Sequence, residues 1–357
     1  MFNKQLLINK NFSIKEALRR LDETAEKVLF VVDDANKLLG SLSDGDVRRY
    51  LLRGESLQGD ISNIFNKSPK FIYQKNLLTR DVKELFIKYK LPLLPVIDAN
   101  NKIYRIIKWE SLLSKDEHIK IKRKRINAPV VIMAGGKGTR LDPFTKVLPK
   151  PLIPVGDKPI IEVIMDKFSE FGIKDFYITI NHKGRMIKAY FEDLTLRYKI
   201  TYIEEETPLG TAGGLKYLQG KFVDDIIVTN SDIIIEEDYA EILKFHKKMK
   251  NDITLVASIK HYNIPYGICD IENGGKLCAI REKPDFSYLV NTGLYILNAG
   301  VIDIIPSDKF YHMTQLINDI KNNGGTVGVY PVSESSWIDI GELEGYKKIL
   351  AKIGYDQ

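Results

Sequence analysis

A cluster of glycines behind an apolar run could bind phosphate. Residues 130–132 read VVI, a β-branched apolar run that predicts a buried strand. The run leads into AGGKGTR at positions 134–140. Because glycine has no Cβ atom, backbone N–H groups in this stretch can close around an anionic group. The stretch therefore predicts a polyphosphate-binding loop, although a glycine cluster alone is as typical of a tight turn.

Two cations follow the glycines at a spacing that suits two phosphates of one nucleotide. Arg140 and Lys150 lie ten positions apart, and Pro149 and Pro151 stiffen the backbone on both sides of the lysine. Gly138 precedes a threonine rather than the lysine of a Walker motif, and the glycine spacing is not GxGxxG. The pattern disfavours a dinucleotide-dependent oxidoreductase, because no acidic ribose partner follows at a suitable distance.

Over residues 130–162 the chain resembles the sugar nucleotidylyltransferases, whose signature is GGxGTRL followed by a Lys-Pro step and a further proline. The resemblance implies transfer of a nucleoside monophosphate from an NTP to a sugar 1-phosphate, with release of pyrophosphate. Two polyanions repel each other, so positioning and charge neutralisation are the expected tasks, rather than proton transfer. The resemblance implies catalytic roles for Arg140, Lys150 and Lys283, and nucleotide binding by Ala134, Gly135, Gly136, Gly138 and Thr139.

Two aspartates far apart in the chain are candidate metal ligands. Asp232 follows the apolar strand pattern of residues 225–230, and Asp339 lies in SWIDIGE, residues 336–342. An aspartate at the end of a strand can also cap the next segment. In the resembling family the two carboxylates share one Mg²⁺ with phosphate oxygens, and Mg²⁺ prefers such hard oxygen ligands. We therefore expect Mg²⁺ as cofactor, bound by Asp232 and Asp339.

Further motifs of the same family would bind the base and the sugar. TPLGTAGGL, residues 207–215, is by itself typical of a turn and a helix start. In the family the backbone at Leu209, Gly210 and Thr211 approaches the nucleotide base. Carboxylate and amide side chains suit the adjacent hydroxyls of a sugar. The resemblance accordingly assigns the sugar phosphate to Gly267, Glu282, Lys283 and Asn291.

Strand and helix patterns alternate after the glycine loop. Residues 175–180 and 200–203 predict strands, and residues 184–191 predict a helix between them. Such alternation predicts a Rossmann-like α/β fold, with a mostly parallel sheet and ligands at the carboxyl ends of its strands. We expect this nucleotidyltransferase domain to occupy residues 128–357.

The first third of the chain contains an internal repeat. Residues 31–33 (VVD) match residues 96–98 (VID) at a spacing of 65, and residues 36–37 (NK) match 101–102. Each copy reads as helix, strand, Asp/Asn turn, strand and helix. We expect a pair of similar α/β units at about 1–60 and 61–120, packed against each other. A basic linker at 121–127 would then lead to the catalytic domain.

Residues 38–49 of the first copy resemble a cystathionine-β-synthase (CBS) domain, so residues 1–120 resemble a CBS pair. In that family a hydroxyl residue and an aspartate three positions later bind an adenine nucleotide, which points to Ser43 and Asp46. Asp46 could instead cap the following helix. The second copy has Arg105, Lys108 and Ser111 at the corresponding positions and lacks the carboxylate. The pair could therefore be a ligand sensor or a structural, dimer-forming scaffold.

Composition limits the remaining function classes. The 357 residues suggest two or three domains, and 44% hydrophobic with 28% charged residues is typical of a globular protein. No apolar stretch is long enough for a membrane span, and no secretory signal is evident, so we expect a cytoplasmic protein with no membrane partner. We also expect a homo-oligomer. The net charge of +6 comes partly from the basic run at 120–125, so no nucleic-acid partner is expected. Cys269 and Cys278 are expected to be reduced packing residues of a hairpin.

The substrates follow less directly. A CBS pair before such a catalytic domain resembles the bacterial guanylyltransferases that activate glucosamine 1-phosphate for legionaminic-acid-type surface sugars. GTP and glucosamine 1-phosphate are therefore the first expectation. Mannose 1-phosphate with GTP is the alternative, followed by uridylyl, thymidylyl or cytidylyl transfer. An alternative function of a different class is that of a non-catalytic, CBS-linked nucleotide sensor.

Overall fold

The computed structural model describes residues 4–24, 26–55, 57, 59–76, 82, 85–86, 88–89, 91–108, 123–341 and 343–352. The chain divides into two compact units. The first unit comprises residues 1–121, 259–289 and 331–335, and the second comprises residues 122–258, 290–330 and 336–357. Ser111 and the first two linker positions, 121 and 122, lie outside the described residues.

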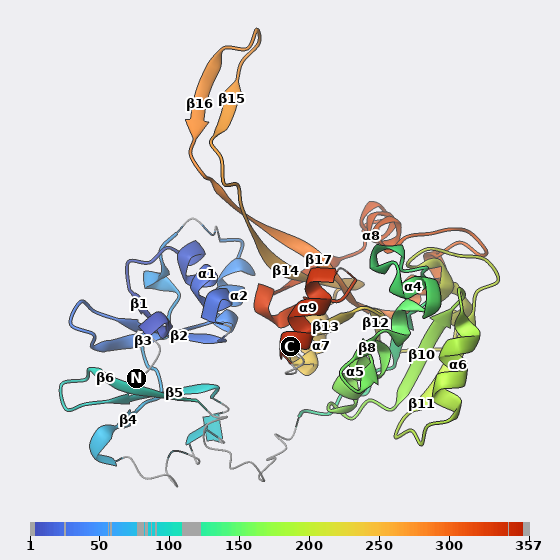
Figure 1. Cartoon of the computed structure of the whole chain (residues 1–357), viewed down its shortest axis with the longest axis horizontal. Coiled ribbons are helices and arrows are strands. Elements are labelled where there is room, and N and C mark those ends of the chain that lie inside the picture. The colour runs from blue at the N-terminus through green and yellow to red at the C-terminus, as the bar shows by residue number, and fades with distance from the viewer. Residues whose placement is uncertain are drawn as a thin grey trace. The chain divides into compact units, whose positions relative to one another are not determined.

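The first unit contains two three-stranded sheets with the same plan (Figure 1). In each sheet the first pair of strands is parallel and the second pair is antiparallel. The second pair has a register shift at the matching position, between Val31 and Val32 in one copy and between Val96 and Ile97 in the other. The strands are β1 (Leu7–Asn9), β2 (Val28–Val32) and β3 (Leu38–Ser43), then β4 (Ile72–Tyr73), β5 (Leu93–Ile97) and β6 (Ile103–Lys108).

The turns that follow β2 and β5 show why the sequence repeats. Oδ1 of Asp33 accepts backbone hydrogen bonds from residues 35 and 37, and Oδ1 of Asp98 accepts the equivalent bonds from residues 100 and 102. Asn36 and Asn101 both have left-handed backbones, with φ of 60° and 61°, a conformation that asparagine tolerates. The two turns also pair with each other through a bridge between residues 37 and 102. The two copies therefore share the same turn, and a bridge joins the two turns.

Helices and a returning segment complete the first unit. Helix α1 (Ile14–Thr24) buries one apolar face, which packs in the same core as β2. Helix α2 (Asp44–Leu51) follows β3 directly. From α2, Nε of Arg48 donates to the carbonyl of Pro331 at 2.6 Å. The backbone N–H of Ser335 donates to Asp22 at 3.3 Å, so residues 331–335 are held by the N-terminal repeat.

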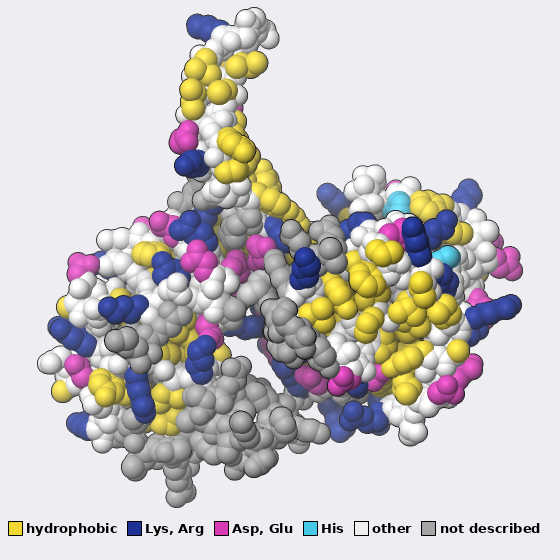
Figure 2. All heavy atoms as spheres, viewed as in Figure 1, with side chains coloured by type: hydrophobic (Ala, Val, Ile, Leu, Met, Phe, Trp, Pro, Cys, Tyr) yellow, Lys and Arg dark blue, Asp and Glu magenta, His cyan; other side chains and the backbone are white. Residues whose placement is uncertain are grey.

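A long hairpin in the first unit corrects one prediction. Strands β15 (Ile268–Ile271) and β16 (Leu277–Arg281) pair only with each other, and the predicted turn joins them. Both cysteines are free and exposed, so the prediction that they are packing residues was wrong. The reason is that the described residues place no second layer against this two-stranded ribbon, whose apolar side chains face outward in Figure 2.

The second unit is built on a seven-stranded sheet in the order β11-β10-β7-β12-β17-β14-β18 (Figure 1). The first four strands in this order are mutually parallel, and β17 is antiparallel to β12. The α/β fold with a mostly parallel sheet is therefore confirmed. The strands are β7 (Val130–Met133), β10 (Asp175–Ile180), β11 (Lys199–Glu204), β12 (Ile226–Asn230), β14 (Ile253–Asn263), β17 (Asp285–Leu297) and β18 (Val327–Val332).

Helices and short elements connect these strands. Helix α5 (Ile160–Ser169) lies between β7 and β10 in the chain, and its Ile160, Ile161, Ile164, Met165 and Phe168 are buried. Further helices are α4 (Phe144–Val147), α6 (Gly184–Glu192), α7 (Tyr239–Met249), α8 (Met313–Asn322) and α9 (Leu343–Lys352). Short strands are β8 (Pro154–Val155), β9 (Lys158–Pro159), β13 (Ile233–Ile235) and β19 (Trp337–Asp339). Short 3-10 helices include η5 (Thr139–Leu141), η6 (Lys150–Leu152) and η7 (Gly213–Leu218). Within the described residues, no helix is both long and apolar enough to cross a membrane.

The described part of the linker packs on the second unit. The guanidinium of Arg123 lies 5.1 Å from the ring centre of Phe171 and pairs with Glu170 at 3.4 Å. Ile126 is buried, and its backbone N–H donates to Phe171. Arg123 and Ile126 therefore attach this stretch to the second unit, while residues 123–125 remain exposed.

Candidate active site

A cavity of about 360 Å³ lies where the parallel strands of the second unit end. Met133 at the end of β7 pairs with Thr179 of β10 and with Asn230 of β12, so the segments that follow these strands begin at the same edge. The cavity is lined by Met133, Gly135, Gly136, Gly138, Thr139, Arg140, Lys150, Thr179, Glu205, Pro208, Leu209, Gly210, Thr211, Asn230, Ser231, Asp232 and Phe310. Sequence-predicted loop, base and metal residues therefore meet in one place.

The glycine loop is shaped by the lysine that follows it. Gly138 has φ of 70°, a left-handed conformation that disfavours other residues. A Cβ atom there would lie 2.8 Å from Cβ of Lys150, which is too close. The loop begins at Ala134, which is buried beneath the cavity and donates its N–H to the carbonyl of Thr179 at 3.0 Å. The glycines therefore bring the loop backbone and the Lys150 side chain into contact.

Strand pairing brings the two predicted metal ligands together. Strands β13 and β19 are antiparallel, with Ile233 opposite Asp339, and the N–H of Ile340 donates to the carbonyl of Asp232 at 2.8 Å. A Cβ atom added at Gly341 would lie 2.6 Å from Oδ2 of Asp232 and 2.8 Å from Oδ1 of Asp339. Two carboxylates separated by more than a hundred residues in the chain thus face one small space beside Gly341, together with the ammonium of Lys150.

Several charged groups lie close together in this space, and they shift the pKa of Asp339 in opposite directions. Burial raises the pKa of Asp339, and the neighbouring charge of Asp232 raises it further. The N–H of Gly341, which donates to Asp339 at 2.7 Å, and the cations Lys150 and Arg140 oppose that rise. The ammonium of Lys150 forms an ion pair with Asp232. Two carboxylates and two cations therefore lie within electrostatic reach of one another.

The pair of carboxylates fits a magnesium ion that also binds phosphate. A Cβ atom at Gly341 would fill the space between the two carboxylates, where the ammonium of Lys150 also lies, 2.9 Å from that Cβ position. Among the described residues, no group of three or more His, Cys, Asp or Glu side chains could hold a metal. Mg²⁺ is usually bound by one or two carboxylates with substrate phosphates and water as the other ligands. Asp232 and Asp339 would hold Mg²⁺ in that way.

A second glycine position shapes the predicted base loop. Gly210 has φ of 81°, and a Cβ atom there would lie 2.7 Å from the carbonyl oxygen of Tyr311. The N–H of Tyr311 donates to the carbonyl of Leu209 at 2.9 Å, and Ala212 donates back to Tyr311 at 3.0 Å. The hydroxyl of Thr211 accepts from the N–H of Met313 at 2.9 Å. The loop is thus fixed by the segment before α8, which the sequence did not reveal.

Comparison with known proteins agrees with this geometry. The family model described as Nucleotidyl transferase matches residues 129–354. The chain belongs to the nucleotidyl transferase family. A model of the CBS domain matches residues 3–53, within the first unit.

The relatives of this nucleotidyl transferase are named for different substrates. The chain is 31% identical over 237 residues to a UTP–glucose-1-phosphate uridylyltransferase of Synechocystis sp., covering 60% of this chain and 61% of that protein. It is 36% identical over 183 residues to a mannose-1-phosphate guanyltransferase of Yarrowia lipolytica, covering 49% and 50%. These matches therefore span only half to three fifths of the relatives' lengths.

One solved structure is similar in fold to this chain. HddC from Yersinia pseudotuberculosis matches with a TM-score of 0.51 and 27% identity, covering 64% of this chain and 100% of that chain. The same protein is also known in a complex with GMP-PN, matching with a TM-score of 0.51 and 26% identity.

Sequence reasoning missed a buried carboxylate in the cavity of this nucleotidyl transferase. Glu205 directly follows β11 and is only 7% exposed. Burial raises its pKa, while hydrogen bonds from the Leu209 N–H, at 3.3 Å, and from Thr179 lower it. A Cβ atom at Gly214 would overlap its carboxylate. The signal was available, because Glu205 stands at the end of a predicted parallel strand, where ligands bind.

The predicted sugar residues are divided between the two units. Gly267, Glu282 and Lys283 belong to the first unit, at the base of the β15–β16 hairpin. A Cβ atom at Gly267 would lie 2.9 Å from Oε2 of Glu282, so these two residues are neighbours. Asn291 lies in β17 of the second unit, where it donates to the Tyr295 hydroxyl at 2.7 Å. Their roles in sugar binding stay predictions.

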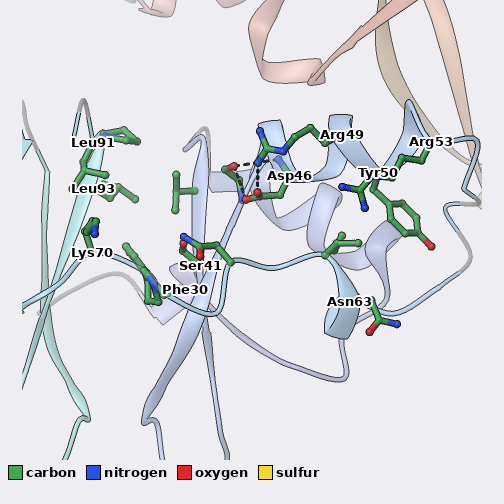
Figure 3. Close-up of a pocket in the computed structure, with 16 residues that line it drawn as sticks. Phe30, Ser41, Asp46, Arg49, Tyr50, Arg53, Asn63, Lys70, Leu91 and Leu93 are labelled. Atoms are coloured by element: carbon green, nitrogen blue, oxygen red, sulfur yellow. Dashed lines mark hydrogen bonds and ion pairs between the residues drawn. The ribbon is translucent and has the colours of Figure 1, made fainter. Parts of the chain in front are cut away.

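A second cavity, of about 550 Å³, lies in the first unit between the two repeats (Figure 3). The first copy contributes Ser43, Asp46 and Arg49, and the second contributes Lys70 and Leu93. Its full lining is Val28, Phe30, Ser41, Ser43, Asp46, Arg49, Tyr50, Arg53, Asn63, Ile64, Asn66, Pro69, Lys70, Leu91, Pro92 and Leu93. The charged side chains in this lining are one carboxylate and three cations.

The carboxylate of that cavity is already engaged with its own helix. Ser43 and Asp46 form a capping box at the start of α2. Oδ2 of Asp46 accepts from the N–H of Ser43 at 2.8 Å and from its hydroxyl at 2.7 Å. Oδ1 pairs with Arg49 (Figure 3). Both predicted residues therefore line a cavity, and Asp46 also has the capping role that the sequence left open.

Proposed function

We propose that the second unit transfers a nucleoside monophosphate from an NTP to a sugar 1-phosphate and releases pyrophosphate. The observation that carries this proposal is the meeting of the glycine loop, Arg140, Lys150 and Asp232 around one cavity, with Asp339 beside Asp232. A sugar-phosphate oxygen attacks the α-phosphorus in line, a P–O bond forms to the sugar phosphate, and the bond to the pyrophosphate leaving group breaks.

The chain's own groups neutralise and position two polyanions. Backbone N–H groups around Gly135, Gly136 and Gly138 hold the triphosphate. Arg140 stabilises charge along the triphosphate, and Lys150 and Lys283 orient the attacking phosphate. When bound, Mg²⁺ supplies charge neutralisation at the phosphate oxygens. A histidine or cysteine nucleophile is not required, because the attacking oxygen is already ionised.

The nucleotide we propose is GTP. The Watson–Crick edge of guanine carries two adjacent N–H donors, and a carboxylate accepts both. Glu205 lies beside the predicted base loop and is such an acceptor. Uracil offers only one donor on that edge. The guanyltransferase named among the relatives and the neighbour complexed with GMP-PN support the same choice.

The sugar we propose is glucosamine 1-phosphate, for legionaminic-acid-type surface sugars, and the support is the sequence resemblance of a CBS pair joined to this catalytic domain. Mannose 1-phosphate is the alternative, because several guanylyltransferase relatives are named for it. Gly267, Glu282, Lys283 and Asn291 would contact the sugar phosphate. We also expect a homo-oligomer, which light scattering would measure.

One experiment tests the reaction and its substrates together. The purified chain is incubated with each of five NTPs crossed with a panel of sugar 1-phosphates and Mg²⁺, and pyrophosphate release is measured. We expect the fastest release with GTP and glucosamine 1-phosphate. Fastest release with mannose 1-phosphate or UTP would reassign the substrates. Nucleotide binding without pyrophosphate from any pair would favour the non-catalytic sensor.

A second candidate function is regulation by an adenine nucleotide in the cavity of the first unit. Arg49, Arg53 and Lys70 supply positive charge for phosphates, and apolar residues such as Phe30 and Leu93 line the same space. Helix α2 borders this cavity, and its Arg48 donates a hydrogen bond to Pro331, which precedes β19 and Asp339 in the chain by six and eight residues. A ligand that moved α2 would thus act on the chain that carries a metal ligand.

AMP and ATP titrations test this candidate. Added across the millimolar range to the best substrate pair, either nucleotide should change the rate. The Arg53→Ala variant should reduce that response. A flat response for the wild-type chain would leave the CBS pair a scaffold.

A further inference from the structure

Phe310 is an exposed aromatic side chain at the edge of the nucleotide cavity. It lines the cavity together with Pro208, Leu209 and Gly210, on the side of the predicted base loop. The residue is 60% exposed, although a phenyl ring gains stability from burial. Its described ring neighbour is His312, at 4.7 Å between ring centres and 82° between ring planes. A single perpendicular neighbour covers at most one face of the phenyl ring.

The backbone around Phe310 is held firmly against the base loop. On one side, the carbonyl of Lys309 lies 2.9 Å from the Cβ position of Gly213. On the other side, Tyr311 exchanges hydrogen bonds with Leu209 and Ala212. The hydroxyl of Tyr311 bonds Asp319 of α8. The ring is therefore exposed on a fixed backbone rather than on a free loop, which lowers the entropy lost on binding.

We propose that Phe310 stacks on the nucleotide base and contributes to a preference for purines. Aromatic side chains offer an apolar face to the π-face of a base, and such stacking is substantial for each base. A purine presents a larger face than a pyrimidine, so it gains more from the same ring. Phe310 would act from the face of the base while Glu205 acts at its edge. The inference rests on the proposed nucleotidyl transfer.

The test compares nucleotides that have a base with one that has none. Binding of GTP, UTP and ribose 5-triphosphate is measured for the wild-type chain and for Phe310→Ala, Phe310→Trp and Tyr104→Ala. Tyr104→Ala is the matched control, because Tyr104 is also an exposed aromatic residue, 53% exposed, on β6 of the other unit. Circular dichroism and thermal melting of each variant check its folding.

We expect Phe310→Ala to weaken GTP binding by about tenfold and UTP binding by less. It should leave ribose 5-triphosphate binding unchanged, because no base is there to stack. Phe310→Trp should bind GTP as tightly as the wild type, and the control should bind all three like the wild type. In turnover assays KM for GTP should rise while kcat stays within about twofold, as for uniform binding energy.

Separate outcomes would overturn the two proposals. Equal GTP affinity of Phe310→Ala and the wild type would remove the stacking role. So would an equal loss of GTP and ribose 5-triphosphate binding, because that would show a structural effect on the cavity. Failure of the proposed reaction appears elsewhere, as a wild-type chain that releases no pyrophosphate while binding of the base remains measurable.

Discussion

The two cavities use similar residue types in different ways. In the first unit, the carboxylate of Asp46 is saturated by Ser43 and Arg49, which lie within three residues of it. In the second unit, Asp339 faces Asp232 from a distant part of the chain, and this proximity with burial raises its pKa. A carboxylate that accepts hydrogen bonds from its own helix stabilises local structure. Two carboxylates held close together repel each other, and a bound cation would relieve that repulsion.

The comparison also separates two kinds of glycine. Gly138, Gly210 and Gly341 allow backbone or charged side chains to approach within distances that a Cβ atom would prevent. At Gly54 in the first unit, a Cβ atom would meet nothing within 4 Å, although φ is 80°. The cavity of the second unit therefore needs glycine for space as well as for conformation.

The largest expected effect tests whether the carboxylate pair is functional. Asp339→Asn should lower turnover on the order of 10³-fold, because removing one ligand costs several kcal/mol of charge stabilisation. Pyrophosphate release measured across a Mg²⁺ titration checks this. Asp193→Asn, an exposed aspartate after α6, is the matched control and should retain activity. Wild-type turnover by Asp339→Asn would make the pair structural, like Asp46.

The same variant should be more stable than the wild type without metal. The folded-state pKa of Asp339 is raised, so the stability it contributes when protonated at low pH is lost as pH rises through that pKa. At pH 7 the buried charge is therefore a cost that asparagine removes. Thermal melting in EDTA should show a higher Tm for Asp339→Asn at pH 7, with the difference shrinking toward pH 4. A lower Tm at pH 7 would contradict this account.

Next in size is the effect of the loop arginine. Arg140→Ala should lower turnover by at least about tenfold with folding intact, because a cation aimed at the triphosphate is lost. Single-turnover pyrophosphate release measures it, and Arg140→Lys should recover part of the rate because it restores the charge without the planar fork. An unchanged rate would remove Arg140 from the mechanism. It would also weaken the view that the charged residues of the second cavity are functional and those of the first are structural.

A smaller effect should appear in the choice of base. Glu205→Gln replaces an acceptor pair by one acceptor and one donor, so it should lower the GTP-to-UTP ratio of kcat/KM by about tenfold. The ratio is measured with both nucleotides in one competition assay. Glu204→Gln, an exposed neighbour in β11, should not change it. An unaltered ratio in Glu205→Gln would limit Glu205 to supporting the loop.

The smallest expected effect belongs to the first cavity. Asp46→Ala removes the capping box of α2 and should cost about 1 kcal/mol of stability. Asp46→Asn keeps a capping oxygen and should cost less. Denaturant unfolding followed by circular dichroism compares the two variants. Equal stability of Asp46→Ala and the wild type would show that capping is not the main role of Asp46 and would favour the nucleotide role.

Local patterns made much of this structure predictable. The glycine loop, the parallel strands and the repeated Asp33 and Asp98 turns depend on short-range sterics and hydrogen bonds, so their residues are visible in sequence. The base-loop partner Tyr311 was missed, because its bonds to residues 209–213 span about a hundred positions. The cysteines were predicted to be packed, since strand residues usually have a layer behind them, and the β15–β16 ribbon has none among the described residues.

The sequence alone determined which residue types could bind phosphate, a base and a cation, because those properties belong to single side chains and to the freedom of glycine. Only the tertiary structure decided which of them share a site. Asp232 and Asp339 meet because β13 pairs with β19, and Glu205 joins the cavity because β11 ends at the same edge as β10. Pairing between distant strands creates these neighbours, and no local pattern in the chain encodes that distance.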